Sequence, residues 1–240
     1  MSETSEYVRK ELMNEILSLT NPHRKLKFRC KIVLWELVVR FTNLTKRSFD
    51  FLVAIILIIL LSPVYICTAI AIYIESPGSI IFKQSRVGKD GKHFSFYKFR
   101  SMVINAEKLK EKLQEQNESG DGVIFKMKKD PRITKIGTII RKFSIDELPQ
   151  LFNVLLGDMS LVGPRPPVPK EVAEYSLEDR KRLHVIPGIT CIWQVSGRSD
   201  IPFNQQVELD KEYIRSKSLF RDLWILLKTV PAVLSGKGAY

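Results

Sequence analysis

The strongest constraint on this chain is an uncharged apolar segment of 24 residues, Phe51 to Ile74, with the sequence FLVAIILIILLSPVYICTAIAIYI. About 20 consecutive apolar residues are enough to cross the hydrocarbon core of a bilayer. As one straight helix the segment would be roughly 36 Å long. Its length and composition therefore predict a chain attached to a membrane.

A serine–proline pair, Ser62-Pro63, interrupts this segment near its middle. Pro63 has no backbone N–H for the carbonyl four residues earlier, and its ring crowds that turn of helix. The half before the break, Phe51 to Ser62, would be roughly 18 Å long, little more than half of the hydrocarbon thickness. We expect the helix to break at Ser62-Pro63.

Basic residues lie on both sides of the apolar segment: Lys46 and Arg47 before it, and Lys83, Arg86 and Lys89 after it. Positive charge favours the cytoplasmic side of a membrane. A re-entrant helix, which enters and leaves on the same side, would satisfy both flanks. A proline-kinked spanning helix remains the alternative at this point.

The overall charge limits the kinds of partner. Lys and Arg total 38 against 26 Asp and Glu, a formal balance of +12. Such an excess indicates an anionic partner, whether nucleic acid, anionic lipid or a phosphorylated metabolite.

The three cysteines, Cys30, Cys67 and Cys191, are far apart and form no CxxC pair, which argues against a disulfide framework or a zinc knuckle. Residues 1–20 are polar and acidic, so we expect no cleaved signal peptide.

We divide the chain into a basic, amphipathic N-terminal segment (1–45), a re-entrant membrane helix (46–75) and a cytoplasmic domain (76–240). The expected fold class is α+β with helices dominant, including amphipathic helices at the surface. A small β-hairpin is predicted at 79–84 and 93–99, joined by a turn containing Asp90-Gly91. Residues 117–122 and 161–169 are predicted loops. Helices are expected at 106–116, 133–143, 148–156, 177–184, 201–216 and 219–230, the last ending before Pro231.

Two adjacent carboxylates, Asp146 and Glu147, are the centre of the densest polar cluster. An aspartate can attack phosphorus and form an acyl phosphate while its neighbour holds a cation. A purely structural alternative is that Ser144 and Glu147 form a helix capping box, with Pro149 near the helix start. The two interpretations can coexist, because a helix N-terminus keeps a carboxylate ionised and also receives phosphate.

Basic side chains surround these acids in Pro- and Gly-rich segments: Lys98, Arg100, Arg132, Lys135, Arg141, Arg165 and Arg198. Guanidinium groups bind phosphate with two parallel hydrogen bonds. A pyrophosphate substrate needs such cations before a nucleophile can approach it. No GxxxxGK[ST] or GxGxxG motif is present, which argues against a P-loop or a Rossmann dinucleotide site.

Several motifs together resemble one family, the monotopic phosphoglycosyl transferases, which are bacterial sugar transferases that begin exopolysaccharide, capsule and O-antigen assembly. The resemblance extends from about Lys46 to Leu234. Besides Ser62-Pro63, it rests on KRSFDF (46–51), YKFRSM (97–102), DPRITKIGTIIRKFSIDELPQLFNVLLGDMSLVGPRP (130–166), PGIT (187–190), WQVSGR (193–198) and ELDKEYI (208–214).

The resemblance implies a re-entrant helix broken at Ser62-Pro63 and a two-step reaction at the bacterial inner membrane, with the catalytic domain facing the cytoplasm. Asp146 would attack the sugar-bearing phosphorus of a UDP-sugar, release UMP and keep the sugar phosphate. Undecaprenyl phosphate, a polyprenyl phosphate, would then accept it. Glu147 would help to bind Mg²⁺, the expected cofactor.

Arg141 and Arg165 match family arginines near the phosphates, and Arg198 matches one associated with the nucleotide. Lys98, from the basic cluster, completes the expected phosphate-binding set. The segment WQVSGRSD resembles members that use glucose or galactose. Cys191 occupies a position where the family usually has glycine.

Two other functions would account for part of the sequence. A membrane-tethered nucleic-acid-binding protein would explain the charge of +12 but not the apolar segment or the acidic pair. A non-catalytic scaffold for polysaccharide assembly would not need Asp146, Glu147 and the arginines together. We therefore expect a UDP-sugar, a polyprenyl phosphate and membrane lipids as partners, and no nucleic acid. A homo-oligomer is compatible with the sequence.

Overall fold

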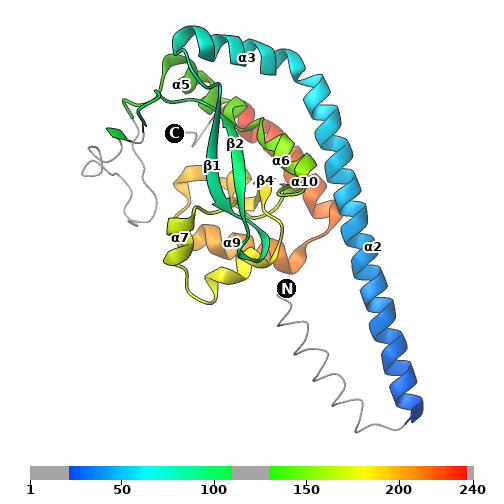
Figure 1. The fold of residues 1–240 in the computed structure, drawn as a ribbon. Helices are drawn as coiled ribbons and strands as arrows, with labels where there is room; N and C mark the ends of the chain where they lie inside the picture. Colours follow the sequence, from blue (N-terminus) through cyan, green and yellow to red (C-terminus); the bar gives the residue numbers. More distant parts are fainter. Residues whose placement is uncertain (1–21, 107, 110–129, 237–240) are drawn as a thin grey trace. The chain divides into compact units, whose positions relative to one another are not determined.

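The computed structural model describes residues 22–106, 108–109 and 130–236. Helices predominate, accompanied by two small sheets, which agrees with the predicted α+β class (Figure 1). The predicted helix at 106–116 lies mostly outside the described residues, and the predicted loop at 117–122 lies entirely outside them. Two compact units meet at Asp50 and Phe51, and each is described by itself.

The first unit contains the beginning of helix α2 (Pro22–Leu60), which continues past residue 50. Large apolar side chains are exposed along this part of the helix, including Leu34, Trp35 and Phe41. Lys46 and Asp50 form an ion pair one helical turn apart, with 3.6 Å between Nζ and Oδ2. Such an apolar exterior is unusual for a helix surrounded by water, and it is consistent with the predicted amphipathic segment.

The second unit begins with the end of α2 and a sharp bend. Helix α3 (Ser62–Glu75) follows after Leu61, and the axes of 28–60 and 62–75 differ by 60°. Among the described residues no single helix meets the length and composition needed to cross a bilayer, whereas this bent pair meets them jointly. The predicted break at Ser62-Pro63 is therefore confirmed.

The serine of the Ser62-Pro63 pair has a definite structural role. In a regular helix the N–H of residue 63 would bond to the carbonyl of Ile59, but proline has no N–H. The hydroxyl of Ser62 donates to this same carbonyl at 2.8 Å. The bend thus leaves the Ile59 carbonyl satisfied, which matters in an apolar environment where an unpaired carbonyl is costly.

Helix α3 packs on one end of a β-hairpin. Strands β1 (Ile81–Val87) and β2 (His93–Phe99) pair antiparallel, with Phe82 opposite Lys98. Ile72 of α3, Phe99 of β2 and Ile140 of α5 (Lys135–Lys142) form the buried centre of this contact. Figure 1 shows α3 passing over α5 at this end of the hairpin.

The hairpin was predicted correctly, but its first strand begins and ends later than expected. The turn occupies the short 3-10 helix η1 (Lys89–Gly91), where Asp90 and Gly91 have φ values of 55° and 79°. Aspartate and glycine tolerate this left-handed conformation better than most residues. Within the hairpin, Asp90 and Gly91 are the residues with positive φ. The turn is therefore short, and β1 continues to Val87.

A second, parallel sheet lies beyond the hairpin and was not predicted. Strands β3 (Ser160–Val162) and β4 (Gly188–Thr190) form it, and β3 falls partly in a segment predicted to be a loop. A Cβ atom added at Gly188 would lie 2.0 Å from the backbone N of Gly163. The close approach of the two strands therefore requires glycine at this position.

Two helices, α6 (Gln150–Leu156) and α10 (Leu219–Ser235), pack on the parallel sheet. The remaining elements are η3 (Ile145–Glu147), α7 (Pro169–Ala173), η4 (Asp179–His184), α8 (Ile192–Ser196), η5 (Arg198–Asp200) and α9 (Phe203–Ser216). The buried Tyr213 hydroxyl of α9 donates at 3.0 Å to the carbonyl of Val162 and lies 2.8 Å from a carboxylate oxygen of Asp222 in α10. These bonds join both helices to β3.

The prediction that the last helix ends before Pro231 was wrong, because α10 continues to Ser235. A proline removes one helical hydrogen bond, here to the carbonyl of Leu227. Leu227 itself is 73% exposed. Helix α10 buries Asp222 and Ile225 and exposes the large apolar side chains of Phe220, Leu227 and Leu234.

Candidate active site

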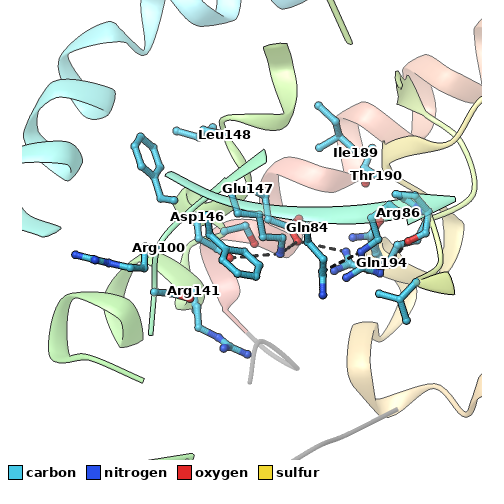
Figure 2. A pocket seen from close by; sticks show the side chains of 18 of the residues that line it. Gln84, Arg86, Arg100, Arg141, Asp146, Glu147, Leu148, Ile189, Thr190 and Gln194 are labelled. Atoms are coloured by element: carbon cyan, nitrogen blue, oxygen red, sulfur yellow. Dashed lines mark hydrogen bonds and ion pairs between the residues drawn. The ribbon is translucent and has the colours of Figure 1, made fainter. Parts of the chain in front are cut away.

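A cavity of about 1280 Å³ opens between the β-hairpin, η3, the 163–168 loop and the segment around α8. Asp146 and Glu147 line it, together with all four predicted phosphate-binding residues, Lys98, Arg141, Arg165 and Arg198. Figure 2 shows the two carboxylates side by side, with Arg141 on one side and Arg86 and Gln194 on the other. The predicted set is therefore assembled at a single site.

Lys98 joins the two carboxylates. Its Nζ lies 2.7 Å from Oε1 of Glu147 and 3.5 Å from Oδ2 of Asp146. Lys98 is on β2, and strand geometry directs its side chain to the same face of the hairpin as Phe82 and Phe96. Asp146 and Glu147 therefore share Lys98 as a cation, although the lysine is on β2 and the acids are in the turn Ile145–Glu147.

The two carboxylates have different electrostatic surroundings. Burial by itself raises the pKa of Glu147, but Lys98 and Arg165 outweigh it and lower that pKa to about 2. Arg165 Nη1 is 3.2 Å from the same oxygen of Glu147 that Lys98 contacts. Burial raises the pKa of Asp146, which Lys98 lowers in part and the Glu147 charge raises further. Glu147 thus remains anionic, and Asp146 is the less stabilised anion of the pair.

The backbone around the acids differs from the predicted capping box. Ser144 has φ 53° and ψ 23°, and its side chain makes no cap hydrogen bond. The left-handed conformation turns its hydroxyl away, and Arg198 Nη2 lies 3.5 Å from Ser144 Oγ. The Glu147 carboxylate bonds to Lys98 and Arg165 instead of a backbone N–H. The capping-box interpretation is therefore wrong.

Asp146 and Glu147 lie in the 3-10 turn η3, and α6 begins only at Gln150, after Pro149. Pro149 is near a helix start, as expected. The carboxylates lie in the turn that leads directly into that helix. Lys98 and, more weakly, Arg141 lower the pKa of Asp146 against the effect of burial.

The other basic residues of the predicted cluster are engaged elsewhere. Arg100 and Arg132 line the cavity, but Arg100 donates to the carbonyl of Ser76 and Arg132 pairs with Asp130. Figure 2 shows the Arg100 side chain pointing away from the carboxylates. Lys135 begins α5 and is not among the described residues that line the cavity. Of the seven basic residues predicted to surround the acids, four are therefore candidates for binding phosphate.

Gln84 and Arg86 of β1 were not predicted as site residues. Arg86 donates to Gln84 Oε1 at 3.1 Å and to the carbonyl of Pro166 at 3.0 Å. Burial, and then the nearby Arg165, lower the pKa of Arg86 to about 10. Side chains alternate between the two faces of a hairpin, and Phe82 of β1 lies opposite Lys98, so Gln84 and Arg86 lie on the same face as Lys98. This alternation could have identified both residues as part of the site.

Cys191 shows why its position does not need glycine. Its φ of −148° and ψ of 174° are extended values that any residue can adopt. The thiol is buried, and its Sγ lies 3.1 Å from Oε1 of Gln194, another side chain that lines the cavity. Cys191 therefore helps to orient Gln194.

Among the described residues, the carboxylate pair offers adjacent oxygen donors of the kind that a divalent cation prefers. In the described residues no three His, Cys, Asp or Glu side chains gather into a metal-binding cluster. Mg²⁺, however, is usually held by one or two carboxylates, with substrate phosphates and water completing its shell. Two adjacent acids, one of them with a pKa of about 2, fit that pattern once a phosphorylated ligand is present.

The described residues thus combine a bent apolar helix pair with a cavity lined by two acids and several basic side chains. The chain belongs to the bacterial sugar transferase family, whose match covers residues 41–236. This bears out the family resemblance drawn from the motifs.

Three relatives illustrate the similarity. The galactosyl transferase CpsE of Streptococcus agalactiae is 49% identical over 180 residues, covering 72% of this chain and 40% of that protein. The undecaprenyl-phosphate galactose phosphotransferase of Salmonella typhimurium is 43% identical over 208 residues, covering 85% and 44%. The exopolysaccharide production protein ExoY of Sinorhizobium fredii is 38% identical over 201 residues, covering 82% and 89%. The chain thus spans less than half of the first two and most of the third.

Proposed function

We propose that this chain transfers a hexose 1-phosphate, from UDP-glucose or UDP-galactose, to undecaprenyl phosphate and releases UMP. The observation that carries this proposal is the Asp146–Glu147 pair, joined by Lys98 in a cavity lined by arginines. A relative with 43% identity is named an undecaprenyl-phosphate galactose phosphotransferase. The reaction would be the first membrane step in the synthesis of an exopolysaccharide, capsule or O-antigen.

Asp146 acts as the nucleophile in this proposal. One of its carboxylate oxygens forms a bond to the phosphorus that carries the sugar, and the bond from that phosphorus to the UMP oxygen breaks. The electron pair leaves with UMP, so no proton transfer is needed. Asp146 is the candidate because Glu147 is bound by both Lys98 and Arg165, which reduces its nucleophilicity.

The second half of the reaction restores the enzyme. An oxygen of polyprenyl phosphate bonds to the same phosphorus, and the acyl-phosphate bond to Asp146 breaks. The product is a polyprenyl diphosphate sugar. Arg141, Arg165 and Arg198 line the cavity and offset the charges of the phosphates during both transfers.

Mg²⁺ is the proposed cofactor, with Glu147 as its protein ligand. Bound there, it would supply charge neutralisation for the pyrophosphate and the departing UMP. Lys98 and Arg165 contact one oxygen of Glu147, Oε1, in the structure, and Oε2 of the same carboxylate would be the atom offered to the cation.

The apolar segment explains how a long-chain acceptor reaches the site. We infer that residues 46–75 form a re-entrant helix in the bacterial inner membrane, with the catalytic domain on the cytoplasmic side. The 60° bend and the basic residues on both flanks support this arrangement. A polyprenyl chain must remain in the lipid, and the re-entrant helix keeps the catalytic domain beside it.

The activity is tested with the detergent-solubilised protein, undecaprenyl phosphate, Mg²⁺ and a panel of UDP-sugars. We expect UMP release with UDP-glucose or UDP-galactose, loss of release on chelation with EDTA, and its return when Mg²⁺ is added in excess. A short water-soluble phosphate should be a much poorer acceptor. If no UDP-sugar yields UMP, the enzyme assignment fails, and a scaffold role takes its place.

The topology is tested by labelling single cysteines placed at residues 20 and 90, after replacement of Cys30, Cys67 and Cys191 by serine. Both sites should react from the cytoplasmic side. Pro63→Leu restores a backbone donor at the break and should move some molecules toward a spanning form. Labelling of the two sites from opposite sides in the unaltered helix would contradict the re-entrant arrangement.

A further inference from the structure

Tyr65 links the bent helix to the candidate active site. It lies on α3, three residues after Ser62, and its hydroxyl donates to the carbonyl of Leu148 at 2.6 Å. Its ring packs edge-on against Phe99, with 5.5 Å between centroids, and Phe152, at 6.1 Å. The hydroxyl is therefore held in place by rings from two other elements.

Leu148 is a sensitive point of the catalytic backbone because it directly follows Glu147. Its N–H donates to the carbonyl of Ile145 at 3.1 Å and closes the turn that carries both acids. Its carbonyl also accepts from the N–H of Leu151 at 3.0 Å, at the beginning of α6. The Tyr65 hydroxyl occupies the second acceptor site of this carbonyl and so fixes the junction of turn and helix.

The other end of α3 holds the segment that carries Arg141. The two carboxylate oxygens of Glu75 accept the backbone N–H groups of Lys135 at 2.8 Å and Ile136 at 2.9 Å. These donors begin α5, and Arg141 lies in the last turn of that helix. Helix α3 therefore contacts the backbone of two of the segments that supply site residues, the turn of the two acids and α5, through one side chain near each of its ends.

We propose that Tyr65 is a positioning residue for the Asp146–Glu147 turn, so that the membrane helix forms part of the frame of the active site. This inference rests on the proposed function, since it assigns Tyr65 an effect on the transfer from UDP-sugar to Asp146. The bend at Ser62-Pro63 sets the direction of α3 and thereby brings Tyr65 to Leu148. Loss of the hydroxyl leaves the acids present but less well aligned with the phosphorus.

The test is Tyr65→Phe, which removes the hydroxyl and keeps the ring contacts. The control is Tyr73→Phe, the same change at a residue of α3 that is 58% exposed. In full-length protein in detergent, we expect the single-turnover rate of UMP release to fall about tenfold in Tyr65→Phe. The KM for the UDP-sugar and the melting temperature should stay at their wild-type values, and Tyr73→Phe should match the wild type throughout.

The outcomes separate this inference from the proposed function. An inactive wild-type protein would overturn the proposed function itself. An active wild type with an equally fast Tyr65→Phe variant would overturn only the role of Tyr65. A slower Tyr65→Phe variant with a clearly lowered melting temperature would also overturn the role of Tyr65, because the hydroxyl would then serve folding and not alignment.

Discussion

Replacing Asp146 with asparagine is expected to abolish sugar-phosphate transfer, with UMP release falling about 1000-fold or more. The amide has nearly the same shape as the carboxylate but lacks the negative charge needed to attack phosphorus. The variant should still fold, because removing one negative charge from a buried site reduces an unfavourable desolvation. Steady-state UMP release at saturating UDP-sugar measures the effect.

A second observation tests the covalent intermediate itself. Wild-type protein incubated with UDP-sugar and Mg²⁺ but without lipid acceptor should gain the mass of one hexose phosphate, on the peptide that contains Asp146. Asp146→Asn should gain none. Asp90→Asn is the matched control, since it makes the same change in an exposed hairpin turn whose φ of 55° asparagine tolerates well. An active wild type without any adduct, whose kinetics require both substrates together, would replace this mechanism by direct transfer.

Features specified by local sequence were the ones predicted correctly. The Asp90-Gly91 turn predicted the hairpin, and the apolar periodicity of α9 predicted its position within two residues. The break at Ser62-Pro63 follows from the chemistry of a single residue, since proline lacks the donor that the helix needs. Each of these outcomes depends on neighbours along the chain.

Features that depend on distant parts of the chain were missed. Strands β3 and β4 have three residues each and pair across 28 positions, from Ser160 to Gly188. So short a strand has no recognisable alternation in the sequence. The pairing of the two strands, with the close approach of Gly163 and Gly188, is visible in the structure. Length and local pattern therefore could not locate this sheet.

The same division applies to the site. Asp146 and Glu147 were identified because adjacent acids in a motif are visible in the sequence, whereas the capping box at Ser144 failed because a left-handed φ cannot be read from residue types. Arg86 was assigned to the basic flank of the apolar segment and not to the site, because one of its contacts there, Pro166, is far away in sequence. The sequence identified the chemical groups but not all of their partners.

Lys98→Met is expected to reduce transfer about 100-fold to 1000-fold at neutral pH, because it removes a cation that contacts both acids. Methionine keeps most of the side-chain volume but lacks the positive charge, which in Lys98 also lies over the Phe96 ring, 5.7 Å from its centroid. Lys92→Met, in the exposed hairpin turn, is the control for the loss of one positive charge. The rate of UMP release is the measurement.

The pH dependence of Lys98→Met distinguishes two roles for the lysine. Attack requires the anionic form of Asp146, so the rate should fall as pH drops through the pKa of that carboxyl. Lys98 lowers this pKa, and burial raises it. Without Lys98 the pKa of Asp146 rises, and the acidic limb of the pH–rate profile should move to higher pH, so that raising the pH recovers part of the lost rate. An equal loss at every pH, with the limb unmoved, would mean that Lys98 serves the phosphates alone and does not tune the nucleophile.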